Sequence, residues 1–372
     1  MSTNILHRSL MGKSQKEGVY LTIELPQGGY ISFSNAVEYR VNKGRWISLN
    51  AGATTVSAPT SGVYNPFEFR AKLTPAQDVG VGTFTIYNAS RAYISGNCMS
   101  LLFGDDAEDE RNISGYDYAF CRLFANVSAT LYVNECILPA RILSDYCYAY
   151  MFENSNIYQF DDDGLPAIYL ADSCYYGMFL NCVNLINVPT LDAYTLERAC
   201  YGEMFKGCTS ITQMSRMRAD KLADYCYFEM FSGCTSLMNV LSFGGEEGFG
   251  HQSCSHMFYG CTSLTSVLNP IDTAVMGISA CWNMFRNCTN LTSVNRLGCS
   301  VLAASCYDYM FYGCSKLNSI KMLATDVSAY ACLDHWVDGV ASSGTFTKHP
   351  NASLPTGVSG IPNGWTVRTA TS

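Results

Sequence analysis

The chain has 372 residues, of which 48% are hydrophobic and only 15% charged, and 23 Lys plus Arg against 31 Asp plus Glu give a net charge of −8. This length allows two or three domains. The acidic balance without a Lys/Arg run disfavours nucleic-acid binding, a 13% aromatic content excludes a disordered chain, and no apolar run is long enough to predict membrane insertion.

Residues 1–18 are predicted to form a flexible arm, with strand exchange or docking on a partner subunit as the alternative. They carry charges but no apolar segment of the kind that a secretory signal needs. We therefore expect the chain to fold in a reducing cytosol, where disulfides are rare, so its 18 cysteines need another explanation.

Residues 19–92 contain short alternating or apolar runs separated by turns that contain Gly, Pro and Asn. This pattern predicts a small β-sandwich-like domain that caps the rest of the chain or docks on a partner. Two acidic runs come later, at 105–110 and 161–164. Both are interpreted as solvated loops, with calcium binding as the alternative, although neither has the ligand spacing of a dedicated calcium loop.

A Met-Phe pair then recurs at intervals of 26 or 27 residues. Its methionines are Met151, Met178, Met204, Met230, Met257, Met284 and Met310, with degenerate copies at Leu123 and Trp336. Around one copy, Cys226, Met230 and Cys234 follow an i, i+4, i+8 pattern that predicts a short helix. A short strand is expected near 237–240, and the Gly-rich stretch 244–250 is expected to project as a loop.

One helix and one strand per repeat predict an α/β leucine-rich-repeat-type solenoid. We expect about 7–9 repeats of 26–28 residues over 93–345, preceded by the small all-β N-terminal domain and followed by a capping segment at 346–372.

Fourteen cysteines fall into two columns that flank the Met-Phe pair. The first is Cys147, Cys174, Cys200, Cys226, Cys254, Cys281, Cys306 and Cys332, and the second is Cys182, Cys208, Cys234, Cys261, Cys288 and Cys314. Free buried thiols that fill a core are the preferred interpretation. Disulfides remain an alternative, as does metal or catalytic chemistry, which the absence of a Cys-x-x-Cys pair disfavours.

Two further columns are candidate recognition surfaces. Strand alternation places a small polar row outward: Asn187, Gln213, Asn239, Ser266, Ser293 and Ser319. An aromatic column follows the first cysteines: Tyr148, Tyr175, Tyr201, Tyr227, Trp282 and Tyr307. The polar row either reads a glycan or a protein strand, or bonds to itself and water. The aromatic rings either stack on sugars or a subunit, or pack half-buried between adjacent helices.

The run Tyr-Cys-Tyr-x-x-Met-Phe-x-Gly-Cys-Thr-Ser-Leu-x-x-Val resembles the BspA-like leucine-rich repeat family. The best matches are 225–240, 254–267 and 281–294, the stretch 307–320 also fits, and the resemblance covers roughly 93–367. It implies a surface-displayed adhesion or recognition protein, and similar arrays occur in phages of gut bacteria.

No catalytic motif is present, so we expect no enzyme activity, no cofactor and no metal site. We expect a virion component of a phage (tail, fibre or head decoration), made in the bacterial cytosol, because no export signal is seen. Its expected partners are other virion proteins, a second copy of itself, or a host-surface protein or glycan. A bacterial cell-surface adhesin and an intracellular scaffold are the alternatives.

Overall fold

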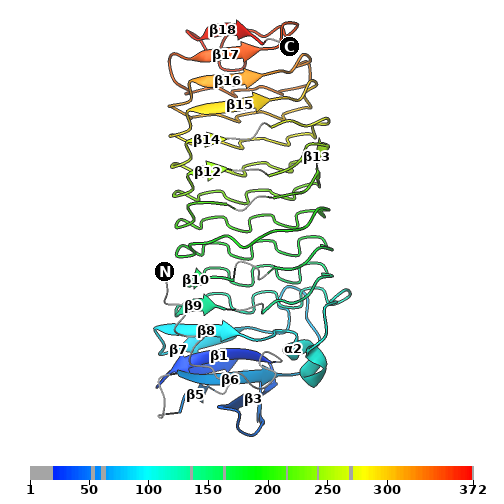
Figure 1. The fold of residues 1–372 in the computed structure, drawn as a ribbon, viewed down its shortest axis with the longest axis vertical. Coiled ribbons are helices and arrows are strands. Elements are labelled where there is room, and N and C mark those ends of the chain that lie inside the picture. The colour runs from blue at the N-terminus through cyan, green and yellow to red at the C-terminus, as the bar shows by residue number, and fades with distance from the viewer. Residues whose placement is uncertain are drawn as a thin grey trace.

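The computed structural model describes residues 20–51, 55–59, 64–134, 137–161, 165–214, 217–240, 243–267 and 271–370. They form an elongated column of stacked chain turns on a β-rich base (Figure 1). The predicted arm at 1–18 lies outside the described residues, as do 162–164 of the second acidic run. Within the described part of the chain, no helix is long and apolar enough to cross a membrane.

Two sheets form the N-terminal base. Its strands are β1 (Leu21–Pro26), β2 (Tyr30–Phe33), β3 (Val37–Val41), β4 (Ile47–Leu49), β5 (Val56–Ser57), β6 (Tyr64–Arg70), β7 (Phe84–Tyr87) and β8 (Arg91–Ser95). β1, β3, β4, β6 and β8 pair antiparallel in one sheet, and β5-β2-β7 form the other. Rings from both sheets meet in the core, where Phe69 and Phe84 have centroids 4.8 Å apart.

The base and the column share one sheet. β8 pairs in parallel with β9 (Thr130–Val133), which pairs in parallel with β10 (Ile157–Gln159). The resulting seven-stranded order is β10-β9-β8-β1-β6-β3-β4. The boundary expected at 92/93 falls inside β8, so backbone pairing runs across it without a break.

The helix predicted in each repeat is wrong. Within the described residues the helical elements are α2 (Ser100–Phe103) and the 3₁₀ helix η1 (Gly104–Ala107), so the fold is almost all-β. The Cys-Met-Cys segments are successive turns in which every fourth residue is left-handed, with φ of 57°, 52° and 74° at Tyr225, Glu229 and Gly233. A right-handed helix cannot contain such residues at every fourth position.

Backbone amides in these turns alternate between two kinds of acceptor. The Met230 amide donates to the Tyr227 carbonyl in the same turn at 3.2 Å, whereas the Phe231 amide donates to the Met257 carbonyl of the next repeat at 2.9 Å. We call each such repeat a rung. Because about half of the amides in a turn segment need the next rung as acceptor, a rung completes its hydrogen bonding only when stacked.

Short parallel strands line one side of the column (Figure 1). They are β12 (Asn239–Val240), β14 (Ser266–Val267), β15 (Ser293–Leu297), β16 (Ser319–Met322), β17 (Thr345–Lys348) and β18 (Thr366–Thr369), paired in that order. On another side, β11 (Lys221–Leu222) pairs with β13 (Gly248–Phe249). The loop predicted at 244–250 therefore does not project freely, since Gly248 and Phe249 are buried in a paired strand.

Stacked rings run through the interior. The phenylalanine after each Met, or after Leu123 in the first copy, lies 5.4–5.8 Å, centroid to centroid, from its equivalent on the neighbouring rung. The series is Phe124, Phe152, Phe179, Phe205, Phe231, Phe258, Phe285 and Phe311. Trp336 ends the series at 5.9 Å from Phe311 and donates its Nε1–H to the Gly360 carbonyl at 2.8 Å. The repeat in the sequence thus becomes a continuous apolar core.

Candidate functional site

Most of the predicted polar row lies in register on neighbouring strands. Backbone pairing aligns Gln213 with Asn239, and then Ser266, Ser293 and Ser319 in turn. The pairing continues to Thr345 and Thr366, which sequence reasoning missed although each alternates with an apolar neighbour. We define the polar row as these members: Gln213, Asn239, Ser266, Ser293, Ser319, Thr345 and Thr366.

The polar row faces outward, and the residue after each of its middle members faces inward. Val267, Val294 and Ile320 are each 1% exposed, whereas Ser266 and Ser293 are half-buried and Ser319 is exposed. Because each of these three serines is at least partly exposed, its hydroxyl can reach a ligand or water.

Asn187 does not belong to the polar row. Its Nδ2 donates to the Phe160 carbonyl at 2.7 Å, and its Oδ1 accepts from the Phe160 amide at 3.3 Å. Both ends of this amide are therefore engaged by backbone of the preceding rung. Asn187 holds two rungs together at a position where sequence alternation predicted a recognition residue.

The strand face carries positively charged residues at its C-terminal end. Lys321, Thr347 and Arg368 are aligned across β16, β17 and β18, two residues after the polar row. Lys321 lies between buried Ile320 and Met322 and is itself partly exposed, so it shares the outward face. The face is consequently cationic at its C-terminal end.

The predicted aromatic column is an interior stack. Tyr148, Tyr175, Tyr201 and Tyr227 are at most 2% exposed, with successive ring centroids 5.5, 5.6 and 6.2 Å apart. Tyr307 is also fully buried. These rings are more deeply buried than expected and cannot stack on a carbohydrate.

Trp282 belongs to a different column, because the spacing slips by one residue in two rungs. The Cys281 amide donates to the Cys306 carbonyl at 2.9 Å, which aligns Cys281 with Tyr307. Cys254 is likewise aligned with Tyr227 through the bond from the Tyr227 amide to the Ser253 carbonyl. Cys254 and Cys281 thus replace rings of the tyrosine stack and leave the first cysteine column. Trp282 is half-buried beside His256, 4.9 Å away.

The second cysteine column forms hydrogen bonds between rungs. Each thiol lies 3.0–3.1 Å from the carbonyl oxygen of the phenylalanine one rung earlier, as between Cys234 and Phe205, and the donors are Cys182, Cys208, Cys234, Cys261, Cys288 and Cys314. Burial raises the pKa of Cys182, Cys234 and Cys314 to about 12. The cysteines that the structure describes are buried, and none of these is in a disulfide; Cys136 lies outside the described residues.

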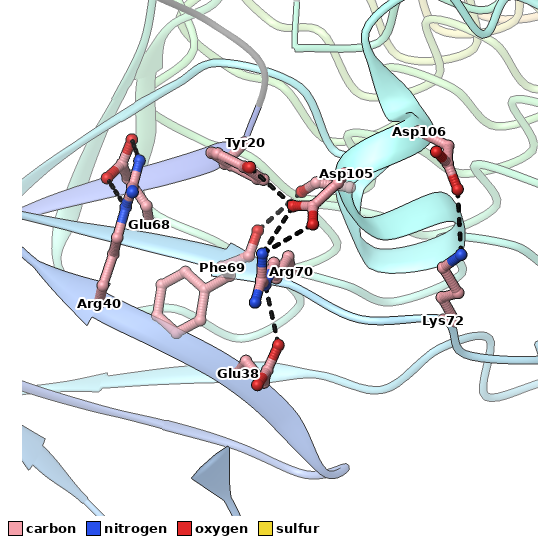
Figure 2. A network of polar contacts seen from close by, with 10 residues as sticks. Tyr20, Glu38, Arg40, Glu68, Phe69, Arg70, Lys72, Asp105 and Asp106 are labelled. Carbon is pink, nitrogen blue, oxygen red and sulfur yellow. Dashed lines mark hydrogen bonds and ion pairs between the residues drawn. The ribbon is translucent and has the colours of Figure 1, made fainter. Parts of the chain in front are cut away.

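The first acidic run fastens the column to the base (Figure 2). Asp105 accepts from the Tyr20 hydroxyl at 2.7 Å and from Arg70 Nη1 at 2.7 and 2.9 Å, and Lys72 lies 3.0 Å from Asp106. The Tyr20 hydroxyl and then Arg70 hold the pKa of Asp105 below its usual value. Both carboxylates are paired with protein groups and yet stay mostly exposed, at 62% for Asp105 and 77% for Asp106, as the predicted solvated loop requires.

Metal binding has no arranged ligand set within the described ranges. No group of three or more His, Cys, Asp or Glu side chains there is placed to hold a metal ion. The thiols of the second cysteine column point instead at carbonyl oxygens, as protonated donors do.

Comparison with known proteins gives one distant likeness. No family model and no curated protein matches the chain. A solved structure of a leucine-rich repeat protein from Bacteroides ovatus aligns with a TM-score of 0.31 and 15% identity, over 67% of this chain and 64% of that chain. The chain therefore spans a little less than two thirds of that protein, and the likeness carries no functional assignment.

Proposed function

We propose that this chain is a non-enzymatic recognition protein, a solenoid of the BspA-like leucine-rich-repeat type that contacts its partner through the polar row. The supporting observation is the register of the row, which runs strand by strand from Gln213 to Thr366. Adjacent strands lie about 4.8 Å apart. A ligand with repeating hydroxyl or amide groups would meet one polar side chain at each step.

The chemistry of the polar row favours binding over catalysis. Ser, Thr, Asn and Gln donate and accept hydrogen bonds, but none of them titrates near neutral pH. General acid–base catalysis needs a titratable group within hydrogen-bond reach of the reacting atoms. The row itself supplies none, so its side chains suit a neutral glycan or an extended protein segment on a host surface.

A substitution in the middle of the row tests this function. Ser293→Lys places a long charged side chain among small neutral ones, and we expect at least a tenfold loss of affinity for the bound glycan or host-surface protein. The matched control is Ser300→Lys, an exposed serine outside the row. Glycan arrays and binding to host-surface fractions, with the whole chain, provide the readout. If Ser293→Lys weakens the binding of no ligand, or if no ligand binds at all, only a subunit-packing role would remain.

The proposed setting is a phage virion, with a bacterial surface adhesin second and an intracellular scaffold third. The repeat pattern of 225–240 supports this setting, because it resembles the BspA-like leucine-rich repeat and similar arrays occur in phages of gut bacteria. Free buried thiols fit synthesis in a reducing cytosol, and a second copy or another virion protein would then be the structural partner. Mass spectrometry of purified particles tests the setting alone, since absence of the chain would remove the virion and leave recognition intact.

A further inference from the structure

A shallow cleft opens where the base meets the first rung. It has a volume of 330 Å³ and is lined from two segments by Thr74, Pro75, Gln77, Gly115, Tyr116, Asp117 and Tyr118. Thr74, Gln77 and Asp117 are exposed, whereas Pro75 and the two tyrosines are half-buried. The cleft lies outside the polar row and contains none of its residues.

Both tyrosines of the cleft pack against other aromatic rings. The Tyr118 ring stacks on Tyr146 of the next rung, with centroids 4.9 Å apart and an interplanar angle of 5°. The Tyr116 ring packs edge-on against Phe103 at 5.2 Å. Both rings are therefore positioned before any ligand arrives, which lowers the entropic cost of binding.

The opposite wall is a closed turn. Ala76 donates its amide to the Gly80 carbonyl at 3.0 Å, and Val81 donates to the Ala119 carbonyl at 3.0 Å, so the turn is bonded to the segment that carries the tyrosines. Gly80 is required there, because a Cβ at its φ of 67° would lie 2.5 Å from the Tyr118 carbonyl oxygen. Gln77 is thus carried on a fixed support.

Both hydrogen-bond donors and hydrogen-bond acceptors line the cleft. The Ser144 hydroxyl donates to Oδ1 of Asp117, which orients the carboxylate and leaves Oδ2 for a ligand. The Gln77 amide supplies both a donor and an acceptor, and the Thr74 hydroxyl supplies another of each. A fixed aromatic surface beside planar hydrogen-bonding groups matches the alternating apolar faces and hydroxyl edges of a sugar ring.

We propose that this cleft binds a neutral saccharide, with the tyrosines against a face of a sugar ring and Asp117 and Gln77 bonded to its hydroxyls. The charge of the site selects against anionic sugars, because its lining holds a carboxylate and no cation. An alkylammonium ion would need aromatic walls on several sides, whereas two tyrosines line this open cleft. The inference stands on residues separate from the polar row and does not rest on it.

The test uses the whole chain and a panel of glucose, galactose, mannose and N-acetylglucosamine oligosaccharides, first immobilised and then titrated in solution. We expect binding of at least one neutral saccharide, with affinity reduced tenfold or more by Gln77→Ala and by Asp117→Asn. Tyr116→Ala should abolish binding and Tyr116→Phe restore it. Gln27→Ala, at an exposed glutamine in another turn of the base, should bind like the unaltered chain.

Three results would overturn the proposal: no binding by any panel member, binding that Gln77→Ala and Asp117→Asn leave unchanged, or stronger occupancy by tetramethylammonium than by any sugar. Circular dichroism and thermal melting of each variant show that it is folded. Ser293→Lys, which tests the polar row, should leave cleft binding unaltered, so the two proposals fail separately.

Discussion

At the end of seven turn segments, a buried side chain donates a hydrogen bond to the phenylalanine carbonyl one rung earlier. In most rungs this donor is a cysteine, but Ser155 takes the same role toward the Phe124 carbonyl. The position therefore requires a small side chain with one donor. A thiol meets that requirement while keeping an apolar surface against the core.

Substitution of Cys234 separates these two requirements. Cys234→Ala removes the donor to the Phe205 carbonyl and leaves a small void, so we expect the free energy of unfolding to fall by about 1–2 kcal/mol. Cys234→Ser keeps a hydrogen-bond donor, as Ser155 does in its own rung, and should lower the free energy of unfolding by less. Urea unfolding of both variants measures the difference. A serine variant less stable than the alanine variant would show that the thiol serves packing alone.

The raised thiol pKa values make stability dependent on alkaline pH. An unfolded thiol titrates near pH 8.5, whereas Cys182, Cys234 and Cys314 titrate at about 12 when folded. Between these values the unfolded chain releases protons that the folded chain keeps. The free energy of unfolding should therefore fall by about 1.4 kcal/mol per pH unit for each thiol, with full stability retained below about pH 8.5.

Urea midpoints measured from pH 7 to 10 test this slope, which Cys234→Ser should reduce. A thiol-reactive label provides a second readout. It should react slowly with the folded chain and count close to 18 thiols in denaturant without reductant. A flat pH profile would contradict the burial of the thiols, and a count near zero would contradict their reduced state.

At the scale of the element, the turn segment repeats every four residues. Its left-handed positions are occupied by ordinary residues such as Tyr225 and Glu229, and by Gly233 at the end. Asn181 and Asn287 take the position of Gly233 in other rungs, with φ of 58° and 62°. Hydrogen bonds to the next rung compensate the backbone strain of the residues that carry a Cβ.

Gly233 provides a matched test of that strain. A Cβ there would have open space, since its nearest neighbour is Gly207 at 3.8 Å, so Gly233→Ala isolates the backbone cost of about 1–2 kcal/mol. Gly233→Asn should cost less, because asparagine tolerates the left-handed region. Thermal melting gives the order of stability. Equal losses for the two variants would place the cost in packing and not in φ.

The same four-residue period explains which part of the element could be predicted. Cys226, Met230 and Cys234 share one face in a helix and in a series of turns alike, so their spacing did not distinguish the two. Residues four apart in a helix are offset by about 40° around its axis. A helical face would therefore have needed an apolar residue at i+7 by the third turn. The unbroken period from Leu222 to Cys234, with glycine or asparagine at fixed positions, was the distinguishing signal.

Register and burial were only partly predictable for the same reason. The repeat length aligned Ser266 with Ser293 and Ser319 because equivalent residues of stacked rungs pair. A one-residue slip before Met257 and Met284 hid the true alignment of Cys254 and Cys281. The sequence predicts half-buried tyrosines next to the first cysteines, yet the stacking of identical rings buries these side chains completely. The cleft was invisible because its two walls are distant in sequence.

At the scale of the whole molecule, the phenylalanine stack connects every rung to its neighbours. The Phe231 ring lies 5.4 Å from Phe205 and 5.8 Å from Phe258, so it is shared by three rungs. We expect Phe231→Ala to reduce the free energy of unfolding by about 3–5 kcal/mol through the cavity it leaves. Phe231→Leu should cost less.

Hydrogen exchange locates the damage. In a one-dimensional array, protection should fall most in the rungs next to Phe231→Ala and least in the base. Compared with the unaltered chain, the variant should exchange faster in peptides that contain Phe205 or Phe258 and should change least in peptides that contain Ile23. Uniform loss of protection along the chain would show that the molecule unfolds as a single cooperative unit.

The alternating amides of the turn segments also give the column a mechanical character. Hydrogen bonds from one rung to the next, such as that from the Phe231 amide to the Met257 carbonyl, connect the rungs along the long axis. Tension on the two chain ends should therefore break these bonds one rung at a time. Each layer of 26 residues would release about 90 Å of chain. In an optical trap, the column should extend as a low-force sawtooth with that step, so a tether built from it would lengthen under load before it broke.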